Sequence, residues 1–237
     1  MARPEWMTLP PPSLDEPETA PAPPSLLAEK QVSRLSTYRR QLQALPPGSS
    51  PTLHSHALAA LCGTTAAHVR RDLMSIGFSG SPVRGYDVRQ LVLAIGRKLD
   101  APGGQFAALA GVGQLGRALL DYFTTRRPNL RIVAAFDIDP EKTRRVTLGC
   151  RVWPLEKLDR VVRDKGITVG VLTVPAESAQ EVADRMVDAG IVGFLNFAPV
   201  PLRLPARTFV GEMDITTSME RVAYFARALA GGRTENP

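Results

Sequence analysis

The spacing of apolar residues differs between two parts of this chain. Between residues 31 and 99 the apolar side chains recur every three or four positions, which predicts amphipathic helices. From residue 105 onward, short apolar runs alternate with helical stretches, which predicts parallel strands with helices between them. Residues 1–30 show no sustained apolar period and contain eight of the 21 prolines. The pattern predicts a disordered proline-rich tail, a small helical domain and then an α/β domain.

The helical domain is expected to begin with three helices. The first covers residues 33–45 and the third covers residues 66–76. The second lies between them, with Ser55 as its N-cap, while Thr64 or Thr65 caps the third. So few turn residues separate the second helix from the third that the two must cross steeply. This spacing predicts a helix-turn-helix.

One face of the third predicted helix carries small and basic side chains and is left uncovered. We expect this face to enter a major groove, where an arginine can bond to a guanine edge or a phosphate. The glycine-rich residues 77–86 are predicted to form a wing that inserts its arginine into the adjoining minor groove. The expected DNA contacts are Ala66, Ala67, His68, Arg70, Arg71 and Arg84. The alternative is an oligomerisation or substrate-capping module.

A glycine motif follows the first apolar run of the α/β part. Gly111 permits a tight turn, Gly113 lets the backbone approach a pyrophosphate, and Gly116 lets a helix pack closely on a strand. A helical stretch and a second apolar run come next, and Asp137 ends that run 21 residues after Gly116. This order is typical of a Rossmann-like dinucleotide-binding fold. The expected cofactor contacts of the loop are Gly111, Val112, Gly113, Gln114, Leu115 and Gly116.

The same motif indicates the kind of nucleotide. The unpaired N–H groups and dipole of a helix N-terminus favour phosphates without any lysine. The Asp137 carboxylate can accept hydrogen bonds from ribose hydroxyls but would repel a 2′-phosphate. NAD(H) is therefore favoured over NADP(H), although Arg144 and Arg145 weaken that preference slightly.

The rest of the chain continues the alternation of strand and helix. Helices are expected over residues 153–164 and 177–189, and strands over residues 167–174 and 191–195. We therefore expect an α/β protein with a mainly parallel sheet. Its expected parts are a winged helix-turn-helix domain (31–100), a Rossmann-like NAD(H)-binding domain (101–215) and a C-terminal helix with a tail (216–237).

Charge and cysteine content narrow the function classes. Residues 31–100 carry nine basic and three acidic side chains, which suits a polyanion-binding surface, although a solvated basic face is the plainer alternative. Cys62 and Cys150 lack metal-ligand spacing, so reduced thiols and no metal site are expected. There is neither an apolar run long enough to span a membrane nor a signal-peptide pattern, so a cytoplasmic location is expected.

Four blocks occur together in one order: Ser33 to Arg40, Val69 to Leu73, the glycine motif with Ala134 to Pro140, and Ala189 to Val200. In this conjunction the sequence resembles the Rex family of bacterial redox-sensing transcriptional repressors, over about residues 31–228. The resemblance implies a homodimer that binds a palindromic double-stranded DNA operator when NADH is scarce. Binding of NADH would release the operator.

The resemblance also implies roles for further residues. Tyr122 and Asp214 match a pair that senses the reduced nicotinamide, and Arg40 matches a residue that couples the two domains. The helix over residues 217–229 would cross into the partner subunit near its nucleotide site. Loops near the nicotinamide are matched by Val174, Pro175, Ala176, Phe197, Ala198 and Pro199. The alternatives are that Tyr122 belongs to the core, that Asp214 caps a helix, and that the two prolines end strands.

Some positions depart from the family pattern. Arg84 is displaced by two positions within the wing, and Ser75 and Ile76 replace aromatic residues. Ile215 stands where Leu or Phe is usual. These differences indicate a divergent paralogue, with an altered operator preference or effector as one alternative.

Two other functions are open to a chain of this kind. An NAD-dependent oxidoreductase needs a general acid or base near the nicotinamide, and all three histidines lie within residues 54–68. No catalytic residue is therefore assigned, and enzyme activity is not expected. A CoA-binding module shares the glycine loop and sheet, but Asp137 argues mildly against it.

Overall fold

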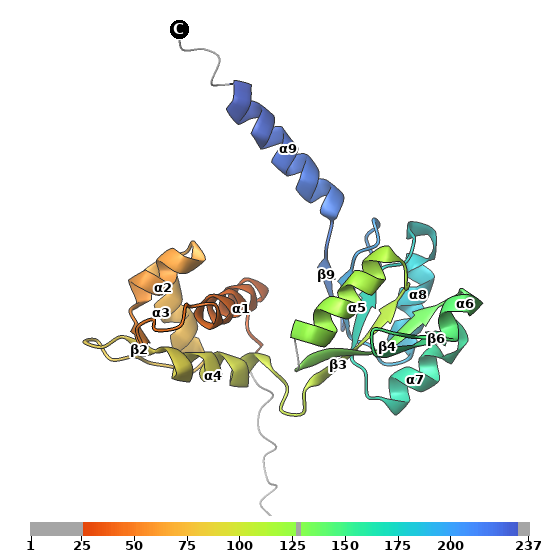
Figure 1. Cartoon of the computed structure of the whole chain (residues 1–237), viewed down its shortest axis with the longest axis horizontal. Coiled ribbons are helices and arrows are strands. Elements are labelled where there is room, and N and C mark those ends of the chain that lie inside the picture. The colour runs from red at the N-terminus through yellow and green to blue at the C-terminus, as the bar shows by residue number, and fades with distance from the viewer. Residues whose placement is uncertain (1–25, 127–128, 232–237) are drawn as a thin grey trace, which may run out of the picture. The chain divides into compact units, whose positions relative to one another are not determined.

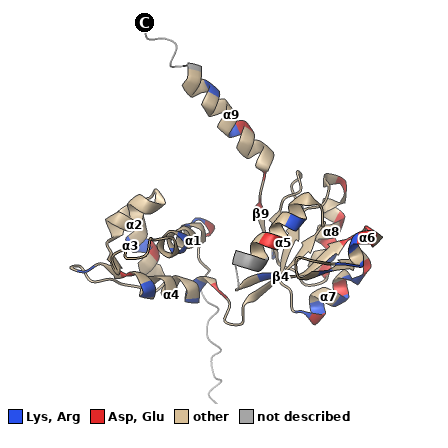
Figure 2. Cartoon of the chain, in the orientation of Figure 1, with Lys and Arg blue, Asp and Glu red and all other residues tan. Residues whose placement is uncertain are grey.

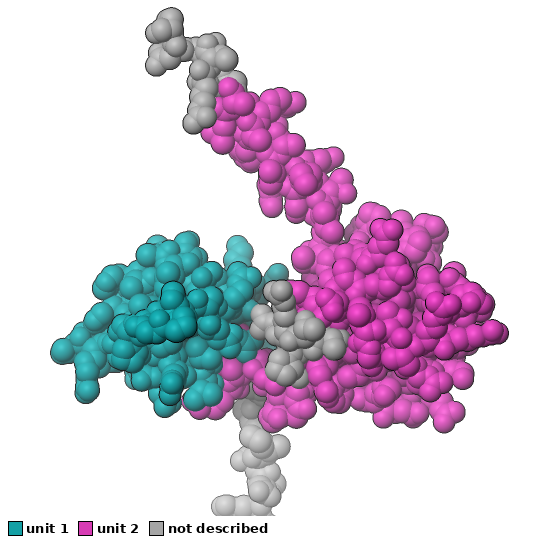
Figure 3. All heavy atoms as spheres, viewed as in Figure 1, with its two compact units in different colours: residues 1–95 teal, residues 96–237 magenta. Residues whose placement is uncertain are grey.

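The computed structural model describes residues 26–126 and 129–231 of the 237-residue chain. The chain divides into two compact units, Met1–Ile95 and Gly96–Pro237 (Figures 1 and 3). Most of the expected proline-rich tail lies outside the described residues, and so do the last residues of the expected C-terminal tail. Each unit has its own buried apolar residues.

In the described residues, the first unit contains four helices and two short paired strands. They are α1 (Glu29–Gln43), β1 (Thr52–Leu53), α2 (Ser55–Cys62), α3 (Ala66–Ser75), β2 (Tyr86–Asp87) and α4 (Val88–Leu99), the last of which continues into the second unit. Gly63 ends α2 in the left-handed conformation (φ 61°). Thr65 caps α3, because its hydroxyl accepts a hydrogen bond of 3.2 Å from the His68 amide. The helix-turn-helix predicted from the sequence is thus present.

A buried carboxylate ties α1 to α3. Asp72 of α3 accepts two hydrogen bonds from the Arg34 guanidinium, at 2.6 and 2.7 Å, and one of 2.9 Å from the Tyr38 hydroxyl. Both donors belong to α1, and Asp72 is only 1% exposed. Burial acts to raise the pKa of Asp72, but the bonds from Arg34 and Tyr38 outweigh it and lower that pKa. This cluster fixes the helix that carries the expected DNA contacts.

Asp72→Ala is expected to lower the free energy of unfolding by about 2 to 3 kcal/mol, because two donors lose their acceptor. Tyr38→Phe removes one bond and keeps the ring, so a loss of only about 1 kcal/mol is expected. Because the pKa of Asp72 is lower in the folded state, its stabilisation is present above about pH 4 and disappears as the pH falls further. Urea unfolding across this range measures the effect; a difference between Asp72→Ala and the parent that does not shrink in acid would contradict it.

The second unit is built on a seven-stranded sheet of order β5-β6-β4-β3-β7-β8-β9. The strands are β3 (Gln105–Ala110), β4 (Leu130–Asp137), β5 (Val146–Thr147), β6 (Cys150–Pro154), β7 (Val169–Leu172), β8 (Gly193–Asn196) and β9 (Phe209–Glu212). Neighbouring strands are parallel, except that β5 runs antiparallel to β6. The predicted α/β fold with a mainly parallel sheet is confirmed.

Helices cover both faces of this sheet (Figure 1). On one face lies α5 (Gln114–Arg126), whose Leu120 belongs to one apolar cluster. On the other lie α7 (Leu158–Asp164) and α8 (Ala176–Asp188), and Met186 belongs to the second cluster. Because successive strand residues point to opposite faces, each buried strand supplies both clusters. This explains why the strands read as continuous apolar runs.

Several local predictions are wrong. Trp153 lies in β6, and α7 begins only after a 3-10 turn, Leu155–Lys157. Ser55 does not cap α2, because the helix begins at Ser55 itself and His54 occupies the N-cap position; the Ser55 hydroxyl accepts a hydrogen bond of 3.1 Å from Arg70. The glycine-rich residues 77–86, in contrast, contain the predicted hairpin: two backbone hydrogen bonds of 2.8 and 2.9 Å between Ser81 and Gly85 close a tight turn, and β2, which follows it, pairs with β1. The short strands β5 and β9 are not predicted by the sequence patterns.

The last described helix, α9 (Ile215–Gly231), follows β9. Its side chains are exposed throughout residues 215–230. Exposed apolar side chains recur every three or four positions at Ile215, Met219, Val222, Phe225 and Leu229. Within the described part of the chain, no helix is long and apolar enough to cross a membrane.

Candidate nucleotide and DNA sites

The glycine loop follows β3, the strand at which the strand order of the sheet reverses. It joins β3 to α5, and β3 has β4 on one side and β7 on the other. In open parallel sheets such a switch point leaves a crevice beyond the carboxyl ends of the strands, where ligands bind. The amides at the start of α5 face this edge and can bind an anion.

The three glycines of the loop have different roles. Gly111 has a φ of 93°, and a Cβ there would lie 2.7 Å from the Thr173 carbonyl oxygen. A Cβ on Gly116 would overlap the carbonyl oxygen of Gly111. Gly113, in contrast, has no atom within 4 Å of the position its Cβ would take. Gly111 and Gly116 therefore hold the loop against the sheet, while Gly113 leaves open space.

Thr173, which follows β7, was not anticipated as part of this loop. Its hydroxyl proton is shared between two acceptors, the Ala110 carbonyl oxygen at 3.0 Å and the Gly111 carbonyl oxygen at 2.7 Å. The Thr173 amide also donates to Ala110 at 2.9 Å. These bonds fix the turn that Gly111 begins.

Asp137 is surrounded by donors from its own chain. Its carboxylate accepts hydrogen bonds from the Val112 amide at 2.7 Å, the Asp139 amide at 2.9 Å and the Lys142 ammonium at 3.1 Å. Lys142 belongs to the short helix α6 (Pro140–Thr143). Asp137 is 8% exposed; burial acts to raise its pKa, but the amides and Lys142 outweigh burial and lower it. The carboxylate is therefore ionised at neutral pH and joins the glycine loop to α6.

A carboxylate has about four acceptor positions, and three are used here. One remains for a ribose hydroxyl, so the expected cofactor role of Asp137 is compatible with these contacts. The hydrogen bond that Asp137 accepts from the Val112 amide could not be predicted from the spacing of the glycine motif.

The other expected cofactor residues follow the neighbouring strands. Val174 and Pro175 lie between β7 and α8, Ala176 is the first residue of α8, and Phe197, Ala198 and Pro199 follow β8, so both segments lie at the carboxyl edge of the sheet. Asn196 shapes the second loop: its side chain accepts from the Ala198 amide at 3.0 Å and donates to Val200 and Glu212 at 2.9 and 2.7 Å. Asn196 was not assigned a role from the sequence.

The expected sensing pair and coupling residue have the following local environments. Tyr122 is 44% exposed on α5, with its ring edge-on to Phe123. Asp214 caps α9, accepting from the Thr217 amide at 2.8 Å and the Thr217 hydroxyl at 2.6 Å, and these bonds lower its pKa. Arg40 is exposed near the end of α1. Their sensing and coupling roles stay predictions.

In the first unit, α3 presents most of the expected DNA contacts to solvent. Ala67, His68, Arg70 and Arg71 are exposed, whereas Ala66 is half-buried. Basic positions also occur on α1 and α4 of this unit (Figure 2). Arg84 is exposed in the turn between Ser81 and Gly85, beside a cavity of about 440 Å³. The unit thus offers a basic, exposed helix face of the kind that enters a major groove.

The combination of these units defines a class of protein: a winged helix-turn-helix DNA-binding domain followed by a Rossmann-like nucleotide-binding domain. Residues 106–200 match the family model "CoA binding domain", and residues 27–73 match the model "Putative DNA-binding protein N-terminus". The chain belongs to the Rex family of redox-sensing transcriptional repressors. It is 36% identical over 205 residues to Rex of Streptomyces griseus, covering 86% of this chain and 81% of that protein.

A Rex protein of Lactobacillus acidophilus is 38% identical over 194 residues, covering 82% of this chain and 92% of the relative. Among solved structures, the Rex-family repressor RSP has a TM-score of 0.79 at 26% identity, covering 89% of this chain and 99% of RSP. RSP in complex with NAD⁺ and operator DNA has a TM-score of 0.78 at 25% identity, covering 90% and 100%. RSP in complex with NADH has a TM-score of 0.77 at 25% identity, with the same coverage.

Proposed function

We propose that this protein is a transcriptional repressor that binds a palindromic operator when NADH is scarce and leaves it when NADH binds. One observation carries the proposal: a glycine loop with a free ligand face at Gly113 occurs in the same chain as an exposed basic helix on a helix-turn-helix. The complexes of RSP with operator DNA and with NADH support the same pair of ligands for this chain.

The mechanism is a shift between two arrangements of a dimer. NADH changes DNA affinity only if it binds one arrangement better than the other, so it must favour the arrangement in which the α3 helices do not match the half-sites. The nicotinamide ring of NAD⁺ is positively charged and that of NADH is neutral. We infer that this charge makes the NADH-bound arrangement less favourable for NAD⁺, so that the protein responds to the ratio of the two.

The exposed apolar face of α9 supports a homodimer. Five large apolar side chains along one helix would remain in water in a single chain, which is costly for a soluble protein. We infer that α9 packs on a second copy, near the partner's nucleotide site. The match of Asp214 to the sensing pair belongs to this proposal, since Asp214 begins the same helix.

Fluorescence anisotropy on the inverted repeats of the protein's own promoter region tests the proposal. The titration is run without nucleotide, with NAD⁺ and with NADH, at one salt concentration, because phosphate contacts make affinity depend steeply on salt. Tight binding that NADH reverses and NAD⁺ does not is the expected result. Binding that is indifferent to both nucleotides would reject NADH as the effector.

CoA is a second candidate ligand, because residues 106–200 match the CoA-binding domain model. The expected role of Asp137 as an acceptor for a ribose hydroxyl favours NADH. Titration of the protein with each ligand separates the two: saturable binding of NADH and none of CoA is expected. We also infer that the protein is not an enzyme, since its relatives are repressors and its histidines all lie within residues 54–68.

Asp137→Ala is expected to weaken NADH binding by about tenfold or more, because the ribose loses an acceptor and the Val112 amide loses its partner. Asp139→Ala is the matched control, since Asp139 is a neighbouring carboxylate that bonds to the Glu141 amide. Isothermal titration with NADH measures both variants. Equal affinities for the two variants would contradict the role given to Asp137.

A further inference from the structure

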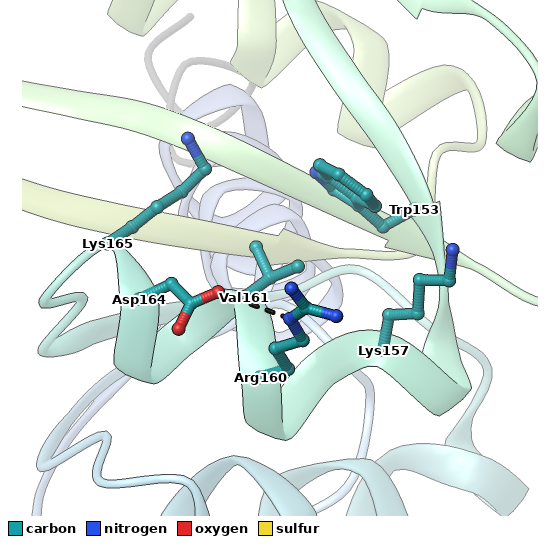
Figure 4. A pocket seen from close by; sticks show the side chains of 6 residues that line it. All are labelled: Trp153, Lys157, Arg160, Val161, Asp164 and Lys165. Atoms are coloured by element: carbon teal, nitrogen blue, oxygen red, sulfur yellow. Dashed lines mark hydrogen bonds and ion pairs between the residues drawn. The ribbon is translucent and has the colours of Figure 1, made fainter.

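A second cavity lies on the α7 face of the sheet. It has a volume of about 450 Å³, and Figure 4 shows the side chains around it. Trp153 of β6 forms one wall, and the remaining lining residues belong to the 3-10 turn, to α7 or to the residue after it: Lys157, Arg160, Val161, Asp164 and Lys165. A volume of this size is within the range of small-molecule sites.

This cavity is separate from the glycine loop. Helix α7 connects the parallel strands β6 and β7, so it runs back toward the amino ends of the strands. Its last residue, Asp164, and the following Lys165 lie toward that edge, whereas Trp153 pairs with Phe136 near the carboxyl edge, so the lining residues extend along α7 rather than around the glycine loop. Trp153 packs with the cluster on the α7 and α8 face, whereas its neighbour Val152 belongs to the α5 face.

The cavity carries excess positive charge. Its one acidic residue, Asp164, already pairs with Arg160 at 3.4 Å. Lys157 and Lys165 form no ion pair among the described residues, and Figure 4 shows them on either side of Trp153. Both lysines are exposed, so their ammonium groups can turn toward an anion at the cavity.

Trp153 adds an aromatic wall and a donor without an acceptor. The Arg151 guanidinium lies 4.0 Å from the centroid of its ring, and the Lys157 ammonium lies 5.8 Å from it. The indole nitrogen is buried and has no hydrogen-bond partner among the described residues. Buried donors in folded proteins nearly always have a partner, so this indole N–H lacks the acceptor that such a donor usually has.

We propose that this cavity is a second ligand site that takes a phosphate-bearing molecule of mononucleotide size. Lys157 and Lys165 bind the phosphates as charge-assisted hydrogen-bond donors. Trp153 and Val161 contact the base, and Arg151 holds the indole in place. The site is distinct from the NADH site, and its occupant does not need the glycine loop.

Tryptophan fluorescence tests the proposal directly. The chain has two tryptophans, so Trp6→Phe in the full-length protein leaves Trp153 as the only indole reporter. ADP is the probe. In this background a saturable change in emission is expected. Lys157→Glu and Lys165→Glu should each raise the half-saturating ADP concentration about tenfold or more, because a repulsion replaces an attraction at the phosphate.

Two controls make the result decisive. Arg207→Glu makes the same charge change at an exposed position outside the cavity and should leave the titration within about twofold of the parent. Asp137→Ala impairs the glycine-loop site and should leave it equally unchanged. No emission change with ADP, or equal effects of Lys157→Glu and Arg207→Glu, would overturn the proposal. A signal that Asp137→Ala removes and Lys157→Glu retains would overturn it too, since ADP would then be at the glycine loop.

Discussion

Arg71→Ala is expected to lower operator affinity by roughly 10- to 100-fold, and the double variant Arg70→Ala/Arg71→Ala to abolish specific binding. Arg71 is exposed on α3 and has no hydrogen bond to its own chain in the described residues. Arg70 is exposed too, but its guanidinium donates to the Ser55 hydroxyl at 3.1 Å, which orients it on the face between α2 and α3. Both guanidinium groups can therefore reach a major groove from one helix.

Anisotropy titrations with operator and with scrambled DNA, at fixed salt, measure this effect. Arg207→Ala is the control, since it removes the same charge from an exposed position in the second unit. NADH affinity should be unchanged in every variant, because the glycine loop is not touched. Operator affinity that falls no further in the α3 variants than in Arg207→Ala would reject the recognition-helix assignment.

Helix ends and tight turns could be predicted from the sequence, because they depend on residues close together in the chain. Gly63 and Thr65 mark the end of α2 and the cap of α3 because left-handed backbone and N-caps each select a few residue types. The glycine motif identified the β3–α5 turn, since only glycine tolerates the close approaches at positions 111 and 116. At these positions a local backbone geometry requires a particular type of residue, so the residue type predicts the geometry.

Contacts between distant residues could not be predicted in this way. The bonds from Thr173 to Gly111 and from the Val112 amide to Asp137 join segments that only the folded sheet brings together. The strand position of Trp153 was missed because β6 ends at Pro154 and a 3-10 turn leads directly from it into α7, so no break in the sequence separates strand from helix. Pairing of β6 with β4 places Trp153 in the strand.

The wing arginine, expected from the sequence to be displaced relative to the family pattern, has a well-defined backbone position. Arg84 lies in a turn closed by Ser81 and Gly85, and a Cβ on Gly85 would lie 2.6 Å from the Leu53 carbonyl oxygen. The turn is thus held firmly against β1, and this fixes where Arg84 leaves the backbone. We therefore expect an altered operator preference, because a minor-groove arginine reads groove width at one position only.

Gly113→Val is expected to leave the fold and operator binding intact and to raise the dissociation constant for NADH by about 10- to 100-fold. The added Cβ has no protein atom within 4 Å, so we expect the substitution to cost the folded chain little; the side chain would occupy the space through which a pyrophosphate would approach the loop. The variant should remain on its operator at NADH concentrations that release the parent protein. The variant would then repress transcription at every ratio of NADH to NAD⁺.

The matched control is Gly103→Val, because Gly103 also has open space around its Cβ position but lies before β3, away from the loop. Thermal unfolding of both variants should stay close to that of the parent, which separates loss of ligand from loss of fold. Gly116→Val adds a second comparison: its Cβ would overlap the Gly111 carbonyl, so it should lose NADH binding and stability together. Release of Gly113→Val from DNA at the parent's NADH concentration would show that the pyrophosphate does not lie at this loop, and would move the effector site elsewhere in the second unit.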